Sequence, residues 1–530
     1  MAKRFGVMLD MSRNAVMKPQ QVKEFASVIK KMGYNMIQLY TEDTYEIPEE
    51  PYFGYLRGRY SQEELKDIVS YCESIGVEVI PCIQTLAHLL QIFRWEAYKD
   101  VHDTTDILLV DEDRTYELIE NMFRSVKECF TSEYVHIGMD EAHMLGLGKY
   151  LNKHGFENRF DILHRHLEKV IVIAKKYGLK PIMWSDMFFR LVNNRAYYLT
   201  DTSLITDEVV ASCPEGVDLV YWDYYQNDKA VYDAMFDAHA KFGTDTWFAG
   251  GTWVWDGFVP SNEWSIETMS LAIQSCLERG IENIMMTLWG DDGKECSFYA
   301  VLTSLFAIRR FYDGVTDMDQ IKREFEELMG ESYDAMMLLD MPINFGPQKR
   351  RDGSPNKYML YSDPFLGFMD SVVIGNLKTE YEALAEKLDA AALKSKYGYL
   401  FESSSALCRV MALKFDLGVR TRAVYHSGDK KEMEALIADY DRTCEALEVF
   451  IRAFRELWFK ENKPNGFEVQ ELRLGGLLLR LRSCRERLAA YMNGEISEIS
   501  ELDEKLLPYR KETRVPGLND WMKTVTPNVL

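Results

Sequence analysis

The sequence predicts a (β/α)8 TIM barrel, an α/β fold, followed by a mainly α-helical C-terminal region. Eight short apolar runs alternate with longer amphipathic stretches over about the first 310 residues. These runs are too continuously apolar to be strands with one solvated face, which favours a closed parallel barrel. Strand-like segments almost disappear after about residue 318. We therefore place the catalytic barrel at 1–317 and the helical region at 318–530.

Each expected strand is a short run rich in β-branched or aliphatic residues. The eight strands are expected at 5–9, 35–40, 77–83, 134–138, 180–184, 217–222, 246–250 and 283–289. Apolar spacing near 3.6 residues predicts helices between them at 19–32, 62–74, 115–130, 160–177, 229–241, 263–279 and 298–310. A glycine just past the last turn is expected to end five of these helices: Gly33, Gly76, Gly178, Gly243 and Gly280.

An open doubly wound sheet is the structural alternative to the barrel. It is disfavoured because no G-x-G-x-x-G pattern follows the first strand, where Gly6 lies inside the strand itself. The P-loop pattern is absent from the sequence as well.

Long charged segments with helical spacing characterise the rest of the chain. They lie at 318–329, 370–393, 397–420, 430–458 and 467–492, and a proline- and glycine-rich stretch between Met341 and Pro364 predicts a connecting segment. The sequence leaves the task of this region open. It could support the barrel, form a homodimer interface, or complete the pocket of a partner subunit.

Composition excludes several functional classes. Among 530 residues, 62 are Lys or Arg and 84 are Asp or Glu, so the net charge is −22, which argues against binding nucleic acid or a membrane surface. The nine cysteines form no C-x-x-C pair, which favours reduced thiols over a disulfide framework or a zinc knuckle. The N-terminus lacks a signal-peptide pattern and no apolar run is long enough to span a bilayer, so we expect a cytoplasmic protein.

The residues that directly follow the expected strands are rich in aromatic and charged groups. In a barrel of this kind the active site lies at the C-terminal ends of the strands. Indole rings stack on the C–H faces of a sugar, and carboxylate and guanidinium groups bind its hydroxyls, so this combination predicts a carbohydrate site. The residues concerned are Arg13, Asp140, Glu141, Trp184, Trp222, Trp253, Trp255, Trp289 and Asp291.

The adjacent pair Asp140-Glu141 is the most specific element of this set. Neighbouring residues on a regular strand point to opposite faces, so both can enter a pocket only where the strand ends, and Gly138 permits such a turn. Adjacent carboxylates are poorly placed to flank one anomeric carbon, as an ordinary retaining glycosidase requires. They suit separate tasks: one acid protonates the leaving oxygen, and the other orients a substrate group that is itself the nucleophile.

The motif His136-Ile-Gly138-Met-Asp140-Glu141 resembles the H-x-G-G-D-E signature of glycoside hydrolase family 20, the β-N-acetylhexosaminidases. Leu9-Asp10-Met-Ser-Arg13 resembles the L-D-x-x-R of the family's first strand, and Trp289-Gly-Asp291 resembles the W-x-E of its eighth. The resemblance covers roughly residues 5–310 and implies a form without the usual N-terminal domain. It implies exo-acting, retaining removal of terminal β-linked GlcNAc or GalNAc through an oxazolinium intermediate, with no cofactor.

The resemblance also implies a role for each residue. Glu141 would be the general acid and later the base, while Asp140 would hold the acetamido N–H and stabilise the oxazolinium charge. Arg13 would bind the O3 and O4 hydroxyls, and Asp291 would bind O4 and O6. Trp184, Trp222 and Trp289 would wall the acetamido pocket, and His88, with Asp43 or Glu42 behind it, would hold the pKa of the acid. We place four further residues in the site: His136, Tyr225, Trp253 and Trp255.

The sequence departs from the family pattern at three positions. Met139 replaces the second glycine of the motif, and Asp291 is one methylene shorter than the family's glutamate. The family's tyrosine to the acetamido oxygen is expected on the seventh strand, where this chain has tryptophans instead. The nearest candidates are Tyr224 and Tyr225, and Tyr224 is preferred because it shares a strand face with Trp222.

Two other functions are weaker alternatives. A metal-dependent hydrolase could use His88, His136, Asp140 and the pair His164-x-His166, but residues two apart on a helix face different directions and no H-E-x-x-H occurs. We therefore expect no metal. A non-catalytic carbohydrate-binding barrel is disfavoured because binding alone needs no acid. The choice between GlcNAc and GalNAc, and the natural aglycone, stay open.

Overall fold

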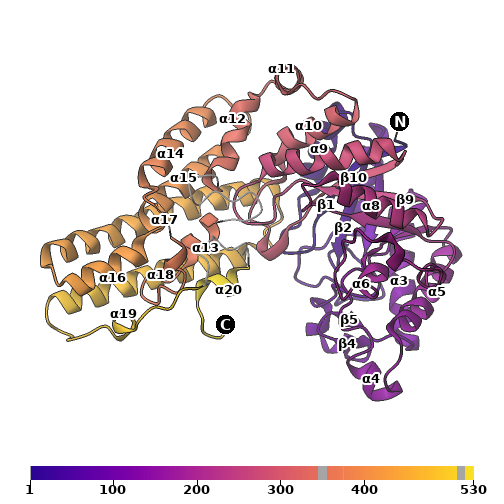
Figure 1. Cartoon of the computed structure of the whole chain (residues 1–530), viewed down its shortest axis with the longest axis horizontal. Helices are drawn as coiled ribbons and strands as arrows, with labels where there is room; N and C mark the ends of the chain where they lie inside the picture. Colours follow the sequence, from indigo (N-terminus) through magenta and orange to yellow (C-terminus); the bar gives the residue numbers. More distant parts are fainter. Residues whose placement is uncertain (1, 344–354, 374, 510–519) are drawn as a thin grey trace. The chain divides into compact units, whose positions relative to one another are not determined.

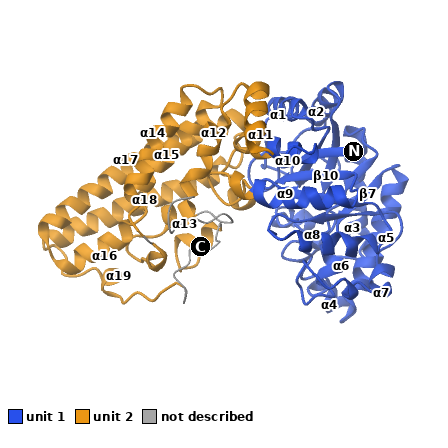
Figure 2. Ribbon diagram, turned by 45° about the horizontal axis from the view of Figure 1, so that its top comes forward, with its two compact units in different colours: residues 1–252, 265–289, 305–316 blue, residues 253–264, 290–304, 317–530 orange. Residues whose placement is uncertain are grey.

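The computed structural model describes residues 2–343, 355–373, 375–509 and 520–530, and these form two compact units (Figure 2). The first unit comprises residues 1–252, 265–289 and 305–316, and the second comprises 253–264, 290–304 and 317–530. The division therefore differs from a single boundary after residue 317. Two short segments, which follow the seventh and eighth barrel strands, group with the helical residues.

The first unit is a closed barrel of eight parallel strands in the order β1-β10-β9-β8-β7-β6-β3-β2. Leu9 of β1 lies opposite Leu288 of β10 and Leu39 of β2, and this pairing on both sides closes the barrel. The predicted fold class is confirmed, and each predicted strand lies within two residues of an observed one. The bounds are β1 Arg4–Asp10, β2 Met36–Glu42, β3 Glu78–Ile83, β6 Tyr134–His136, β7 Lys180–Trp184, β8 Asp218–Trp222, β9 Thr246–Gly251 and β10 Asn283–Leu288.

The helices between these strands lie on the outside of the barrel (Figure 1). Their ends follow local sequence: α2 begins with a capping box in which Ser61 and Glu64 bond each other's main chain, and Gly178 ends α5 with a φ of +67°. All seven predicted helices are present. They are α1 Pro19–Lys31, α2 Gln62–Ser74, α3 Asp113–Cys129, α5 Arg159–Lys176, α8 Lys229–Ala240, α9 Asn262–Glu278 and α10 Leu302–Tyr312, the last preceded by the 3-10 turn η5, Phe298–Val301.

Several short elements lie in the loops after the strands and are not predicted. They are the hairpin β4 His102–Thr104 with β5 Ile107–Leu108, the helices α4 Lys149–His154, α6 Asp186–Arg190 and α7 Asp207–Ala211, and the 3-10 turns η1 Ile92–Arg94, η2 Glu96–Val101 and η3 Thr202–Leu204. The main-chain N–H of Tyr150 in α4 donates to Asp103 Oδ1 in β4 at 2.8 Å. Elements this short carry no sustained periodicity, which is why pattern reading misses them.

The second unit is mainly helical. Its core is a stack of long helices in which α15 packs on α14 and α17, and α17 packs on α18. Part of the predicted connecting segment is helical (α13), and residues 344–354 of it lie outside the described residues. The bounds are α11 Met318–Met329, α12 Tyr333–Met337, η6 Leu338–Ile343, α13 Pro355–Tyr361, η8 Asp370–Val372, α14 Lys378–Ala392, α15 Gly398–Lys414, α16 Leu417–Ser427, α17 Lys430–Glu461, α18 Phe467–Met492, α19 Ser500–Asp503 and α20 Trp521–Val525.

A search of the described residues finds no helix with both the length and the apolar character needed to cross a bilayer.

Candidate active site

The turn after β6 brings the two neighbouring carboxylates to the end of the barrel strand. β6 ends at His136, and Gly138, Met139 and Glu141 then adopt φ angles of +71°, +71° and +51°. At Gly138 a Cβ atom would lie 2.0 Å from Gln84 Oε1, so only glycine fits there. Left-handed backbone at non-glycine residues is costly and is concentrated at functional sites. The turn interrupts the alternating side-chain directions of the strand at Asp140 and Glu141, as the sequence predicts.

Asp140 is nearly buried and is held by two side chains from the loop after β3. Gln84 Nε2 donates to Asp140 Oδ1 at 2.8 Å, and His88 Nε2 lies 3.1 Å from Asp140 Oδ2. Burial by itself would raise the pKa of Asp140, but the charge and hydrogen bond of His88 and the bond from Gln84 hold it below its usual range. Burial would lower the pKa of His88, whereas the Asp140 charge raises it to about 9. The arrangement favours an ionised Asp140 beside a protonated His88.

The predicted relay behind the acid has a different geometry. His88 contacts Asp140, whereas the family resemblance implies that it holds the pKa of Glu141. Asp43 does not stand behind His88, because its carboxylate pairs with Arg57, whose Nη2 lies 3.1 Å from Asp43 Oδ1. The charge of Asp140 has the larger effect on the pKa of His88, and the charge of Glu42 adds to it in the same direction. Burial raises the pKa of Glu42 to about 7, against the opposing charges of Arg13 and His88.

Arg13 lies between two strand-end carboxylates. Its Nε is 3.8 Å from Asp10 Oδ2 and 3.4 Å from Glu42 Oε1, and its side chain is 31% exposed. Asp10 Oδ1 also accepts from the main-chain N–H and the hydroxyl of Ser12, each at 2.8 Å. These contacts fix the guanidinium at the barrel end, where hydroxyl groups of a ligand can reach it.

Glu141 reaches solvent beside its buried neighbour. Its side chain is 42% exposed, and Arg190 Nη2 lies 3.3 Å from its Oε1. Its main-chain N–H donates to Asp186 Oδ2 at 3.1 Å.

Indole rings line the same strand ends. The Trp184 ring lies 4.3 Å from the His136 ring and 6.0 Å from the Trp289 ring, and Trp289 meets Tyr40 edge-on at 4.8 Å. His136 is wholly buried, its Nδ1 accepts from the main-chain N–H of Gly138 at 3.1 Å, and burial lowers its pKa to about 3. His136 is therefore placed to support the Trp184 ring. The sequence predicts instead that His136 contacts the sugar directly.

The two candidate tyrosines differ sharply in environment. Tyr224 is buried, and its hydroxyl is hydrogen-bonded to the side chains of Trp289 and Thr287. Its ring stacks on Trp222 at 5.4 Å, with 19° between the planes. Burial and the charge of Asp140 contribute to a raised Tyr224 pKa. Tyr225 is 44% exposed. Of the two tyrosines, Tyr224 is therefore the one that contacts Trp222 and Trp289, and its pKa responds to the charge of Asp140.

Three predicted site residues belong to the second unit. Trp253 and Trp255 stack on each other at 4.5 Å, and Asp291 begins the 3-10 turn η4, Asp291–Gly293. The loop that carries Asp291 is fixed by a buried charge cluster, which we define as Asp292, Glu295, Lys357 and Arg473. Lys357 Nζ lies 2.9 Å from Asp292 Oδ2 and 2.7 Å from Glu295 Oε2, and Arg473 Nη2 lies 3.0 Å from Asp292 Oδ1.

Four residues of this site were not predicted: Tyr40, Gln84, Asp186 and Arg190. Gln84 and Asp186 lie at the ends of the third and fifth barrel strands, where the strand-end rule points, but their residue types alone assign them no role. Arg190 lies four residues after Asp186 on one helix, a spacing typical of an ion pair. Tyr40 lies inside β2 and carries no comparable signal.

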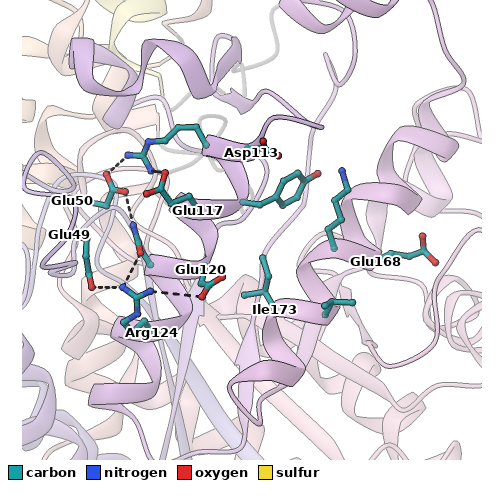
Figure 3. Close-up of a pocket in the computed structure, with 13 residues that line it drawn as sticks. Glu49, Glu50, Asp113, Glu117, Glu120, Arg124, Glu168 and Ile173 are labelled. Carbon is teal, nitrogen blue, oxygen red and sulfur yellow. Dashed lines mark hydrogen bonds and ion pairs between the residues drawn. The ribbon is translucent and has the colours of Figure 1, made fainter.

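Other features lie away from this site. A cavity of about 1130 Å³ lies against α3, α5 and the residues before α2, and Figure 3 shows Arg124 between Glu49 and Glu120 there. It contains none of the predicted site residues. His166 Nε2 lies 2.9 Å from the main-chain oxygen of Thr85, and His164 Nδ1 lies 2.9 Å from that of Ser212. In the part of the chain that the structure describes, no three His, Cys, Asp or Glu residues gather as metal ligands.

A parallel barrel with carboxylates and indoles at its strand ends has the groups that a carbohydrate-processing enzyme needs. Comparison with protein families identifies the group. The model described as "Glycosyl hydrolase family 20, catalytic domain" matches residues 5–221, and that described as "Glycoside Hydrolase 20C C-terminal domain" matches residues 331–519. The chain belongs to glycoside hydrolase family 20.

Individual relatives are more distant. Hexosaminidase D of Bos taurus is 25% identical over 252 residues, which cover 44% of this chain and 65% of that protein. Hexosaminidase D of Homo sapiens is 25% identical over 244 residues, which cover 43% of this chain and 45% of that protein. The chain thus spans less than two thirds of these relatives. The solved β-N-acetylhexosaminidase of Bacteroides fragilis is 18% identical, with a TM-score of 0.49 over 62% of this chain and 70% of that one.

Proposed function

We propose that this protein is an exo-acting, retaining β-N-acetylhexosaminidase that removes terminal β-linked GlcNAc or GalNAc by substrate-assisted catalysis. The observation that carries the proposal is that the neighbouring carboxylates Asp140 and Glu141 have different environments. Asp140 is buried, accepts a hydrogen bond from Gln84 and is kept ionised by His88 at 3.1 Å, while the next residue extends into solvent. Family membership and the hexosaminidase relatives support the same activity.

In the first step the substrate supplies its own nucleophile. The carbonyl oxygen of the 2-acetamido group forms a bond to the anomeric carbon while the bond to the leaving oxygen breaks, and Glu141 transfers its proton to that oxygen. Asp140 accepts a hydrogen bond from the acetamido N–H and stabilises the positive charge of the oxazolinium ring. A charge fixed in a buried site needs no reorganisation during the reaction. The intramolecular attack supplies the proximity advantage that an enzyme nucleophile otherwise provides.

In the second step Glu141, now a carboxylate, takes a proton from water. The water oxygen bonds to the anomeric carbon on the face that the leaving group occupied, and the bond to the acetamido oxygen breaks. The product keeps the β configuration, and Glu141 is protonated again for the next cycle.

The other side chains bind the sugar. Tyr224 donates its hydroxyl proton to the acetamido oxygen, and Trp184, Trp222 and Trp289 wall the acetamido group. Arg13 binds the O3 and O4 hydroxyls, and Asp291 binds O4 and O6. The two epimers differ at O4, so comparing kcat/KM for the 4-nitrophenyl glycosides of GlcNAc and GalNAc identifies the preferred sugar.

The nine cysteines are all free thiols, and eight are buried. Reduced cysteines suit a reducing compartment, so we place the enzyme in the cytoplasm.

The direct test combines two variants and two substrates. Glu141→Gln should lower kcat/KM for 4-nitrophenyl N-acetyl-β-glucosaminide by roughly 100- to 10,000-fold, the usual contribution of a general acid. Asp140→Asn should lose activity while a thiazoline analogue of the intermediate binds more weakly. Equal turnover of the plain β-glucoside, which lacks the amide arm, would contradict the proposal.

A further inference from the structure

Asp186 is a buried carboxylate that the proposed mechanism does not use. It opens the short helix α6 directly after β7, and its side chain has no exposed surface. Its Oδ2 accepts two hydrogen bonds, from the main-chain N–H of Glu141 at 3.1 Å and from Arg190 Nε at 2.9 Å. One carboxylate oxygen therefore ties the backbone of Glu141 to the side chain of Arg190.

Arg190 completes a closed set of contacts around Glu141. Its Nη2 lies 3.3 Å from Glu141 Oε1, and its Nη1 donates to the main-chain oxygen of Arg195 at 3.1 Å. The guanidinium carbon lies 5.8 Å from the centres of the Tyr197 and Trp222 rings, within the range of cation–π attraction. Arg190 is thus fixed on several sides, and it presents one N–H to Glu141.

Glu141 is a residue that needs such support. Its φ of +51° is a left-handed conformation, which is unfavourable for an L-residue with a side chain. Its half-exposed side chain also has several rotatable bonds, whose freedom must be lost before a proton can be aimed at one oxygen atom. Asp186 holds the backbone of Glu141 in its left-handed conformation, and Arg190 holds its carboxyl. Together they restrict both the backbone and the side chain of Glu141.

We infer that Asp186 and Arg190 are positioning residues of the acid, and that they place the Glu141 carboxyl at the leaving oxygen of the substrate. This inference rests on the proposed function. Positioning of this kind has a kinetic signature, because proton donation matters most for leaving groups that depart poorly as anions. Displacing an acid by about 1 Å can cost on the order of 100-fold in rate.

The experiment compares kcat/KM for two aryl N-acetyl-β-glucosaminides, one with a poor leaving group (phenyl) and one with a good leaving group (2,4-dinitrophenyl). Arg190→Met removes the guanidinium and keeps most of the side-chain volume. It should lower kcat/KM for the phenyl glycoside by about 10- to 100-fold and leave the dinitrophenyl value within roughly threefold. Arg190→Lys should recover part of the loss, and Asp186→Ala should act in the same direction as Arg190→Met.

The ratio of the two kcat/KM values does not depend on how much of a variant is folded, so misfolding cannot imitate the result. Arg195→Met is the matched control, since the Arg195 side chain is exposed and only its main chain meets Arg190. It should leave the ratio unchanged. Equal losses on both substrates in Arg190→Met, or no loss, would overturn the inference. Retention of activity by Glu141→Gln would instead refute the proposed function itself.

Discussion

His88 Nε2 lies 3.1 Å from Asp140 Oδ2, in a site where both side chains are largely removed from water. Each group shifts the pKa of the other toward its charged form, in opposition to burial: His88 rises to about 9 and Asp140 falls below its usual range. The pair therefore links the charge state of the site to the stability of the barrel.

This linkage predicts a definite pH dependence of stability. Because the folded pKa of His88 is above its ordinary 6.5, its contribution is complete below pH 6.5 and is lost as the pH rises through about 9. His88→Gln should lower the free energy of unfolding by on the order of 3 kcal/mol near pH 6, and the difference should shrink toward pH 10. Urea denaturation at several pH values measures it. The exposed His154→Gln should show no such trend, and a pH-independent difference for His88→Gln would contradict the assignment.

Gly138 offers a test of the turn that presents the dyad. In Gly138→Ala the new Cβ would lie 2.0 Å from Gln84 Oε1, so the amide that bonds Asp140 must move. We expect destabilisation of about 2–4 kcal/mol, from the strained φ together with overpacking, and loss of most activity. Gly178→Ala is the control, since Gly178 has a φ of +67° and nothing within 4 Å of the added atom. The control should show only the conformational cost, and similar losses in both variants would show that contact with Gln84 is unimportant.

The two neighbouring tyrosines can be separated by removing one oxygen atom from each. Tyr224→Phe should lower kcat/KM for an N-acetylglucosaminide by roughly 100-fold, the usual effect of deleting one donor to a developing charge. The exposed Tyr225→Phe should change it by less than about threefold. If Tyr225→Phe gave the larger loss, the acetamido contact would belong to the other tyrosine.

Lys357 tests the buried charge cluster of the second unit. Its side chain is wholly buried, and Lys357→Met would leave Asp292 and Glu295 with one cationic partner fewer. Removing one member of a buried ion pair costs about 3–5 kcal/mol, so chemical denaturation should shift to clearly lower denaturant. Lys378→Met removes an exposed pair with Glu382, whose atoms lie 3.9 Å apart, and should cost less than about 0.5 kcal/mol. Equal stability of the two variants would show that the cluster contributes little.

The barrel could be predicted because its strands and long helices repeat at fixed periods. The segment predicted as a strand at 180–184, for example, is β7, and the segment predicted as a helix at 62–74 is α2. The strand-end rule placed Asp140 and Glu141 correctly at the end of β6. Periodicity is a local signal, and it is strongest where one face of an element is buried.

The contacts within the site could not be predicted in the same way. Glu42 and His88 have φ angles of +41° and +58°, so their side chains leave the strand ends in directions that no repeat encodes. The resemblance implies Asp43 or Glu42 behind His88, and in the structure Asp43 pairs with Arg57. The short helix α6 was missed for a related reason: five residues are too few for a helical pattern, and Arg190 was missed with it.

The charge cluster around Asp292 also bears on biosynthesis. The groups that fix the loop after β10 are all translated after the loop itself: Lys357, Arg473 and the main-chain N–H of Trp521, which donates to Asp292 Oδ2 at 2.6 Å. A nascent chain that has finished its last barrel strand therefore still lacks the partners of that loop. A chain that stops before Trp521 leaves the ribosome with the Asp291 loop incompletely anchored.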